Sequence, residues 1–217
     1  MNPSTLDELL LAHAAGRLPL PVDLLVASHL TLRPESRPAH AVFEQLGGAL
    51  LEEIDPEPLD PKAFERLRDR LDRETGPEEA PAPPVEPSAG APALPAPLLA
   101  YVPEGIGGLR WRRYGRIAEA VLDLGSPGFT TRLVRAEPGA ALFRHTHEGL
   151  EATLVLEGAY RDGTGRYGPG DIELADGAVD HRPTAEPDAP CLCLTVTSAP
   201  LRLTGRFLRF LNPFVRL

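Results

Sequence analysis

Metal-ligating residue types are concentrated between residues 139 and 158, where the chain reads GAALFRHTHEGLEATLVLEG. His145 and His147 are separated by one residue, so on a β-strand their side chains point to the same face. Glu151 lies beyond an expected turn and returns on the next strand, and His181 follows thirty residues later. Three imidazoles and one carboxylate suit Zn²⁺, Fe²⁺ or Mn²⁺. An isolated His-x-His pair usually lies on a surface, but the added glutamate, histidine and flanking glycines favour a metal site at these four residues.

The ligand set leaves the identity of the metal open. Four protein ligands close the coordination of a tetrahedral zinc ion, which is typical of a structural or sensory site. Fe²⁺ or Mn²⁺ in the same set would retain open positions for dioxygen or a substrate, as in an oxygenase. We expect zinc, with iron or manganese as alternatives.

Two cysteines, Cys191 and Cys193, follow His181 on an expected strand. At this spacing they share a face, but their Cβ atoms lie farther apart than the ~3.5–4.5 Å that a disulfide needs. If they face the interior near the metal, they are candidate redox residues. The alternative is that they are two small apolar core residues, which buried cysteines commonly are.

The elements that must position these residues are short strands. From residue 98 onward, apolar stretches alternate with turns rich in glycine, proline and aspartate, which predicts an antiparallel barrel or sandwich. The expected strands span residues 118–124, 130–136, 152–156, 160–166, 171–174 and 191–197.

The first 76 residues have the pattern of four helices. Thr5 and Glu8 form a capping-box signature at the first helix, and Asp60 with Pro61 marks the start of the fourth. We expect these helices to form a small antiparallel domain. Its inward-facing residues on the third and fourth helices are predicted to be Val42, Leu46, Ala49, Leu50, Ile54, Phe64, Leu67 and Leu71.

Residues 77–97 are rich in proline, alanine and glutamate. Such a composition cannot bury a core and favours extended polyproline II structure. We therefore expect a helical domain over residues 1–76, a linker over 77–97, and a β-domain with a C-terminal tail over 98–217.

The net charge of −9 lies entirely in the N-terminal part of the chain. Residues 1–86 contain seventeen acidic and eight basic residues, whereas residues 87–217 contain fourteen of each. An acidic segment argues against nucleic acid as a direct partner and permits a basic protein surface. We find no signal-peptide pattern and no apolar run of about 20 residues, so we expect a cytoplasmic protein without a membrane partner.

Two motifs resemble those of cupins. Residues 139–158 match the first cupin motif, and residues 163–171 together with His181 resemble the second. The stretches HRP at 181–183, CLCL at 191–194 and APLRLTG at 199–205 resemble the ChrR family of anti-sigma factors more narrowly.

This resemblance implies a multidomain α+β protein with a sigma-binding helical domain and a zinc-binding cupin β-barrel, a double-stranded β-helix. It also implies that the partner is an extracytoplasmic-function sigma factor and that the cupin relays oxidative stress. Cupins often associate through barrel strands, so a homodimer is a further expectation.

One motif departs from the family pattern. Related zinc-dependent anti-sigma factors bind zinc in the helical domain through an early histidine and an H-x3-C-x2-C motif. Here His13 takes the place of the early histidine and His29 that of the motif histidine, whereas Arg33 and Ser36 occupy the cysteine positions. An arginine cannot ligate zinc and a neutral serine hydroxyl is a poor ligand, so we expect no zinc at these four residues.

Three hypotheses follow for the function. The first is an anti-sigma factor that sequesters an extracytoplasmic-function sigma factor and whose metal-binding cupin senses oxidative stress. The second is a metal-dependent cupin enzyme, a dioxygenase or hydrolase, with a helical appendage. The third is a homodimeric binding module. The first is favoured, because no acid, base or nucleophile beyond the ligands indicates an enzyme.

Overall fold

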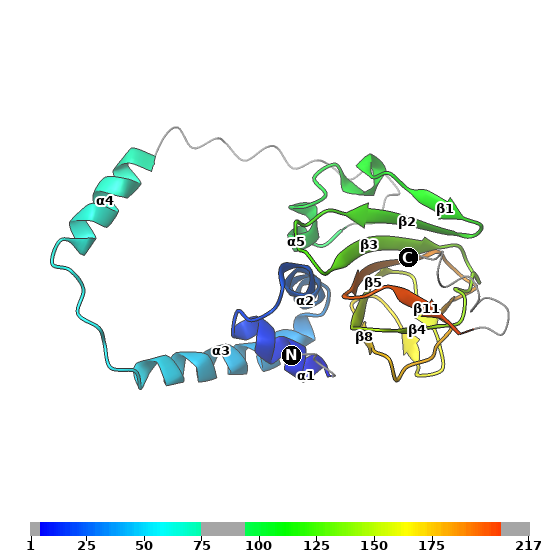
Figure 1. Ribbon diagram of the computed structural model, residues 1–217, viewed down its shortest axis with the longest axis horizontal. Helices are drawn as coiled ribbons and strands as arrows, with labels where there is room; N and C mark the ends of the chain where they lie inside the picture. The colour runs from blue at the N-terminus through cyan, green and yellow to red at the C-terminus, as the bar shows by residue number, and fades with distance from the viewer. Residues whose placement is uncertain (1–4, 75–93, 205–217) are drawn as a thin grey trace.

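The computed structural model describes residues 5–74 and 94–204 (Figure 1). Residues 5–74 are called the helical part, and residues 94–204 the β-domain. The helices are α1 (Leu6–Ala14), α2 (Leu20–Leu32), α3 (Arg37–Glu52), α4 (Ala63–Glu74) and α5 (Ala96–Leu99), with 3₁₀ turns η1 (Pro34–Ser36) and η2 (Gly105–Gly108). The strands are β1 (Arg112–Tyr114), β2 (Ile117–Leu122), β3 (Thr130–Ala136), β4 (His145–His147), β5 (Glu151–Glu157), β6 (Tyr160–Arg161), β7 (Arg166–Tyr167), β8 (Ile172–Ala175), β9 (Thr184–Ala185), β10 (Cys191–Thr197) and β11 (Leu201–Leu203).

The β-domain is antiparallel, as its alternating pattern predicts. A six-stranded sheet has the order β1-β2-β3-β10-β5-β8, and β11-β4 and β7-β6-β9 form two smaller sheets. The central strand β10 pairs with β3 and β5, so Thr197 lies opposite both Thr130 and Glu151. Strands β3 and β10 have the bounds predicted from the sequence.

The two faces of the large sheet have different roles. On the outer face, Leu133, Leu154 and Leu194 are fully buried in a core that also contains Leu25 and Val26 of α2. Side chains on a strand alternate faces, so the neighbouring residues point into the β-domain. The helical part and the β-domain thus share one hydrophobic core across the sheet.

The first two helices begin as expected. The N-cap Thr5 accepts a hydrogen bond from the backbone N–H of Glu8 at 3.2 Å, and Pro21 lies in the first turn of α2. Figure 1 shows α1 and α3 lying together below α2, with α4 well separated from them.

The expected inward faces of α3 and α4 are wrong. Val42 on α3 is 60% exposed and Phe64 on α4 is 72% exposed. The other large apolar residues expected to face inward are exposed as well: Leu46, Leu50, Ile54, Leu67 and Leu71. Both helices are amphipathic, but the described chain offers no apolar surface that covers them.

Most of the expected linker, residues 77–93, lies outside the described residues, and the domain boundaries stay a prediction. Leu94 is already buried, and Pro95 is the N-cap of α5, whose Leu98 is fully buried beside α2. Within residues 5–74 and 94–204, none of the helices has the length and apolarity of a membrane-spanning segment.

Candidate metal centre

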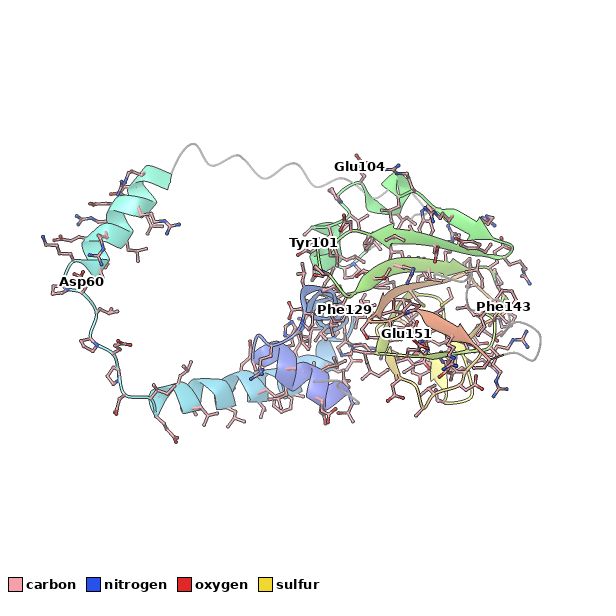
Figure 2. The ribbon with its side chains drawn as sticks, in the orientation of Figure 1. Asp60, Tyr101, Glu104, Phe129, Phe143 and Glu151 are labelled. Atoms are coloured by element: carbon pink, nitrogen blue, oxygen red, sulfur yellow. The ribbon has the colours of Figure 1, made fainter. Side chains whose placement is uncertain are left out.

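The structure brings the four predicted ligands together inside the β-domain. Strand β4 carries His145 and His147 on one face, and β5 begins with Glu151. His181 forms a β-bridge with His145, which brings the fourth ligand next to the first. All four residues are at most 9% exposed. Figure 2 labels Glu151 within the β-domain.

The distances between the donor atoms fit one metal ion. Glu151 Oε2 lies 2.9 Å from His147 Nε2, 3.9 Å from His145 Nε2 and 3.8 Å from His181 Nε2. His181 Nε2 lies 3.1 Å from the Nε2 atoms of both other histidines. Four ligand atoms at ~2.0–2.2 Å from a central zinc ion are separated by about 3.4 Å in a tetrahedron. The cluster is therefore able to hold a metal with little movement of its side chains.

Neighbouring groups orient two of the imidazoles for this role. His145 Nδ1 donates to the carbonyl of Phe143 at 2.8 Å, which leaves Nε2 free as a ligand. His181 Nδ1 lies 3.0 Å from Asp162 Oδ2 and 3.1 Å from Glu173 Oε1. A metal-ligating histidine commonly has such a partner on its other nitrogen, because that hydrogen bond fixes the ring and its tautomer.

Burial and hydrogen bonding shift the pKa values of the cluster. Burial alone would raise the pKa of Glu151, but the adjacent His145 and His147 lower it to about 2, so the carboxylate is ionised. Burial would lower the pKa of His181, yet Glu173 and Asp162 raise it to about 9. Without a metal ion, protonated His181 offsets the negative charge of the buried Glu151 carboxylate. A bound cation would take over that role.

Sequence reasoning missed the residues that support His181. Asp162 and Glu173 form a second group of potential ligands with His181, but they contact the nitrogen opposite the one facing Glu151. Tyr160 donates to Glu173 Oε2 at 2.5 Å. The alternation of β8 places Glu173 on the same face as Ala175, which pairs with Glu151. The register of β8 against β5 is the signal that would have identified Glu173.

Both cysteines line the interior cavity of the β-domain that also contains the cluster. They are buried and free, with their Sγ atoms 3.6 Å apart. The hydrogen bond with Cys191 and burial both raise the pKa of Cys193, so this group is a neutral thiol at neutral pH. The two cysteines face the interior, where the redox hypothesis places them, but a neutral thiol reacts more slowly with oxidants than a thiolate, and the redox role stays a prediction.

The degenerate motif of the helical part forms a contact with the β-domain. His29 Nδ1 donates to the carbonyl of Gly170 at 2.6 Å, and Ser36 Oγ lies 2.9 Å from the other ring nitrogen. Arg33 Nη2 donates to Asp171 Oδ1 at 2.5 Å. Gly170 has a φ of +84°, and a Cβ there would lie 2.5 Å from Arg33 Cγ, so the close approach requires glycine.

The fourth member of that motif lies elsewhere. His13 Nδ1 is 2.8 Å from His40 Nε2, and its Nε2 is 3.7 Å from Asp23. Among the described residues, no group of potential metal ligands includes His13 or His29. Arg33 and Ser36 act in a hydrogen-bonded contact between the two parts of the chain.

Comparisons with known proteins agree on one family. Residues 111–200 match the family described as "ChrR Cupin-like domain". The chain is 40% identical to the anti-sigma-E factor ChrR of Cereibacter sphaeroides, over 97% of this chain and 96% of that protein. A crystal structure of Rhodobacter sphaeroides SigE in complex with the anti-sigma ChrR matches with a TM-score of 0.74 at 36% identity, covering 89% of this chain and 97% of that chain.

The fold and the interior ligand cluster thus define a cupin-like domain joined to a helical part. The extent of the sequence match identifies the family: the chain belongs to the ChrR family of anti-sigma factors. The predicted resemblance and fold class are confirmed. Both of these relatives are named as anti-sigma factors, so the comparisons point to a regulator rather than to the alternative of a cupin enzyme.

We expect the full chain to bind one metal ion, and His147→Ala to lose most of it, because three donors hold a zinc ion less tightly than four. The measurement is metal content after dialysis, by elemental mass spectrometry. His13→Ala is the control and should retain the metal. Loss of metal from His13→Ala, or full retention in His147→Ala, would contradict the assignment.

The Arg33–Asp171 contact predicts energetic coupling between the two parts of the chain. Both side chains are about one-third exposed, so we expect a coupling of about 0.5–1 kcal/mol in a double-mutant cycle of Arg33→Ala and Asp171→Asn. Urea unfolding of the four proteins measures it. Strictly additive effects would show that this contact does not link the two parts.

Proposed function

We propose that this protein is an anti-sigma factor whose helical part sequesters an extracytoplasmic-function sigma factor and whose cupin-like domain holds a sensory zinc ion. The observation that supports it most strongly is the 40% identity to an anti-sigma-E factor along almost the entire chain. Two structural features support it further: exposed apolar faces on the helical part, and strands that contact both the metal cluster and the helical part.

The binding surface is the pair of exposed apolar faces on α3 and α4. On α3 the face is formed by Val42, Leu46, Leu50 and Leu51, and on α4 by Phe64, Leu67 and Leu71. Contiguous apolar patches of this kind mark protein interaction sites in soluble proteins. An amphipathic helix can place such a face into an apolar groove of a partner. Because α4 lies apart from the β-domain (Figure 2), its side chains are accessible to a sigma factor.

The charge of the helical part favours the same class of partner. Residues 1–86 contain about twice as many acidic as basic residues. A sigma factor binds DNA and promoter-associated polymerase, so it carries basic surfaces that an acidic segment attracts. Helix α4 itself carries four acidic and four basic residues, so the acidic excess lies elsewhere in residues 1–86 and would steer the sigma factor toward the helices. Contact with the apolar faces of α3 and α4 would then block the use of the sigma factor in transcription.

Zinc is the metal that suits the cluster best. Three imidazole nitrogens and one carboxylate oxygen at tetrahedral spacing complete the coordination of Zn²⁺ and leave no position for a substrate. When bound, the ion would replace the proton on His181 as the charge that balances Glu151. Such a closed site is consistent with regulation.

Two strands of the large sheet contact both the cavity that contains the metal cluster and the core shared with the helical part. Strand β5 begins with Glu151 on its inner face, and its Ala152 and Leu154 lie in the core shared with α2. Strand β10 carries Cys191 and Cys193 in the cavity wall and Leu194 in the shared core. Oxidation of the cysteines or loss of the metal would alter the strands on which the helices rest, and so weaken sigma binding.

Binding is tested with the full chain and the extracytoplasmic-function sigma factors of its host. We expect a stoichiometric complex, and at least about tenfold weaker affinity for Leu46→Asp or Phe64→Asp, because each places a charge on the apolar surface. Val121→Asp, an exposed site on β2, is the matched control. Unchanged affinity in both helical variants, or no complex with any sigma factor, would refute the proposal.

The sensory role is tested on the purified, metal-loaded complex. We expect hydrogen peroxide or photochemically generated singlet oxygen to release the sigma factor, and Cys191→Ser with Cys193→Ser to slow that release. Size-exclusion chromatography with metal analysis measures it. Thr195→Ser, on the same strand and face, is the control. A complex that stays intact under both oxidants would contradict sensing by the cupin-like domain.

A further inference from the structure

The cavity of the β-domain is larger than a metal site requires. It has a volume of about 580 Å³ and is lined by the inner faces of β2, β3, β5 and β10. Pockets of ~300–1,000 Å³ are typical of small-molecule sites. Among its lining residues, Tyr114 and Phe143 are each more than half exposed, so they lie at the opening. Figure 2 shows Phe143 at the edge of the β-domain opposite the helices.

A buried guanidinium lies on one wall of this cavity. Arg132 occupies the inner face of β3 opposite Thr195, and its side chain is 12% exposed. Its Nη1 contacts Thr197 Oγ1 at 3.4 Å, a long hydrogen bond, and its buried Nε has no hydrogen-bond partner in the described part of the chain. A guanidinium has five N–H donors, so Arg132 has already lost much of its hydration while retaining unused donors.

The acidic group near Arg132 does not satisfy these donors. Glu119 Oε2 lies 3.5 Å from Arg132 Nε, close enough for an ion pair, but the contact does not form a hydrogen bond. Glu119 therefore balances part of the charge and leaves the buried Nε–H of Arg132 without a hydrogen bond. A carboxylate matches the planar fork of a guanidinium with two parallel N–H···O bonds, which is the strongest arrangement available to arginine.

The remaining wall is largely apolar. Its lining includes Ile117, Val134, Ala140, Leu142 and Leu201, as well as the aromatic residues at the opening. An acid with a short hydrocarbon tail would contact this wall while its carboxylate reaches Arg132.

We propose that this cavity is a binding site for a small monocarboxylic acid with an apolar tail, with its carboxylate held by Arg132 and its tail lying against the apolar wall. The site is distinct from the sigma-binding surface of α3 and α4. It adds a ligand to the same domain that contains the metal cluster, and it does not depend on sigma binding.

The test is isothermal titration calorimetry of the full chain with octanoate and with octan-1-ol, which has the same chain length but no charge. We expect octanoate to bind once per chain and at least tenfold more tightly than octan-1-ol. Arg132→Gln should reduce octanoate affinity at least tenfold. Arg135→Gln is the matched control, because that arginine lies on the same strand, is exposed and does not line the cavity.

A second variant covers the case in which Arg132→Gln does not fold. Glu119→Gln removes the competing carboxylate and retains the shape of the side chain, so it should strengthen octanoate binding. The proposal is overturned if octanoate does not bind, if octan-1-ol binds equally well, or if Glu119→Gln weakens the binding of octanoate. Equal affinity in a folded Arg132→Gln variant would also overturn it.

Discussion

The structure depends on strand β5, whose two faces line two different interiors, the ligand cluster and the hydrophobic core under α2. Strand β5 places Glu151 among the three histidines on one face and places Ala152 and Leu154 in the core under α2 on the other. Adjacent residues on a strand cannot move independently, because a shift of one changes the position of the next. The ligand cluster and the core residues on which α2 packs are therefore connected directly through β5.

The cost of burying the cluster explains why a metal ion would suit it. Three imidazoles and a carboxylate lie together at less than 10% exposure, where an unpaired charge is strongly disfavoured. Protonated His181, supported by Asp162 and Glu173, compensates for the negative charge when no cation is present. A divalent cation would satisfy all four donors at once, and its binding energy would add to the stability of the folded domain.

The sequence predicted the parts of this arrangement that depend on local pattern. Alternation placed His145 and His147 on one face, and the expected strands 130–136 and 191–197 have those bounds in the structure. The capping residue Thr5 was also predictable, because a cap is a local interaction. Contacts between distant residues were not. Arg33 and Asp171 are 138 positions apart, and only the packing of α2 on the sheet brings them together.

The faces of α3 and α4 show a different limit. Their spacing correctly predicts amphipathic helices, but periodicity does not reveal whether the surface that covers an apolar face belongs to the same chain. Here the described chain leaves Leu50 and Phe64 exposed. The support of His181 by Glu173 was missed for a related reason: the register of β8 against β5 was needed to place that carboxylate beside the cluster.

The most direct test of this account is X-ray absorption spectroscopy of the zinc-loaded full chain. A site built from His145, His147, Glu151 and His181 predicts four nitrogen or oxygen ligands at about 2.0–2.2 Å and no sulfur. A sulfur ligand at about 2.3 Å would show that Cys191 or Cys193 replaces one of these residues, and would contradict the assignment of the metal centre.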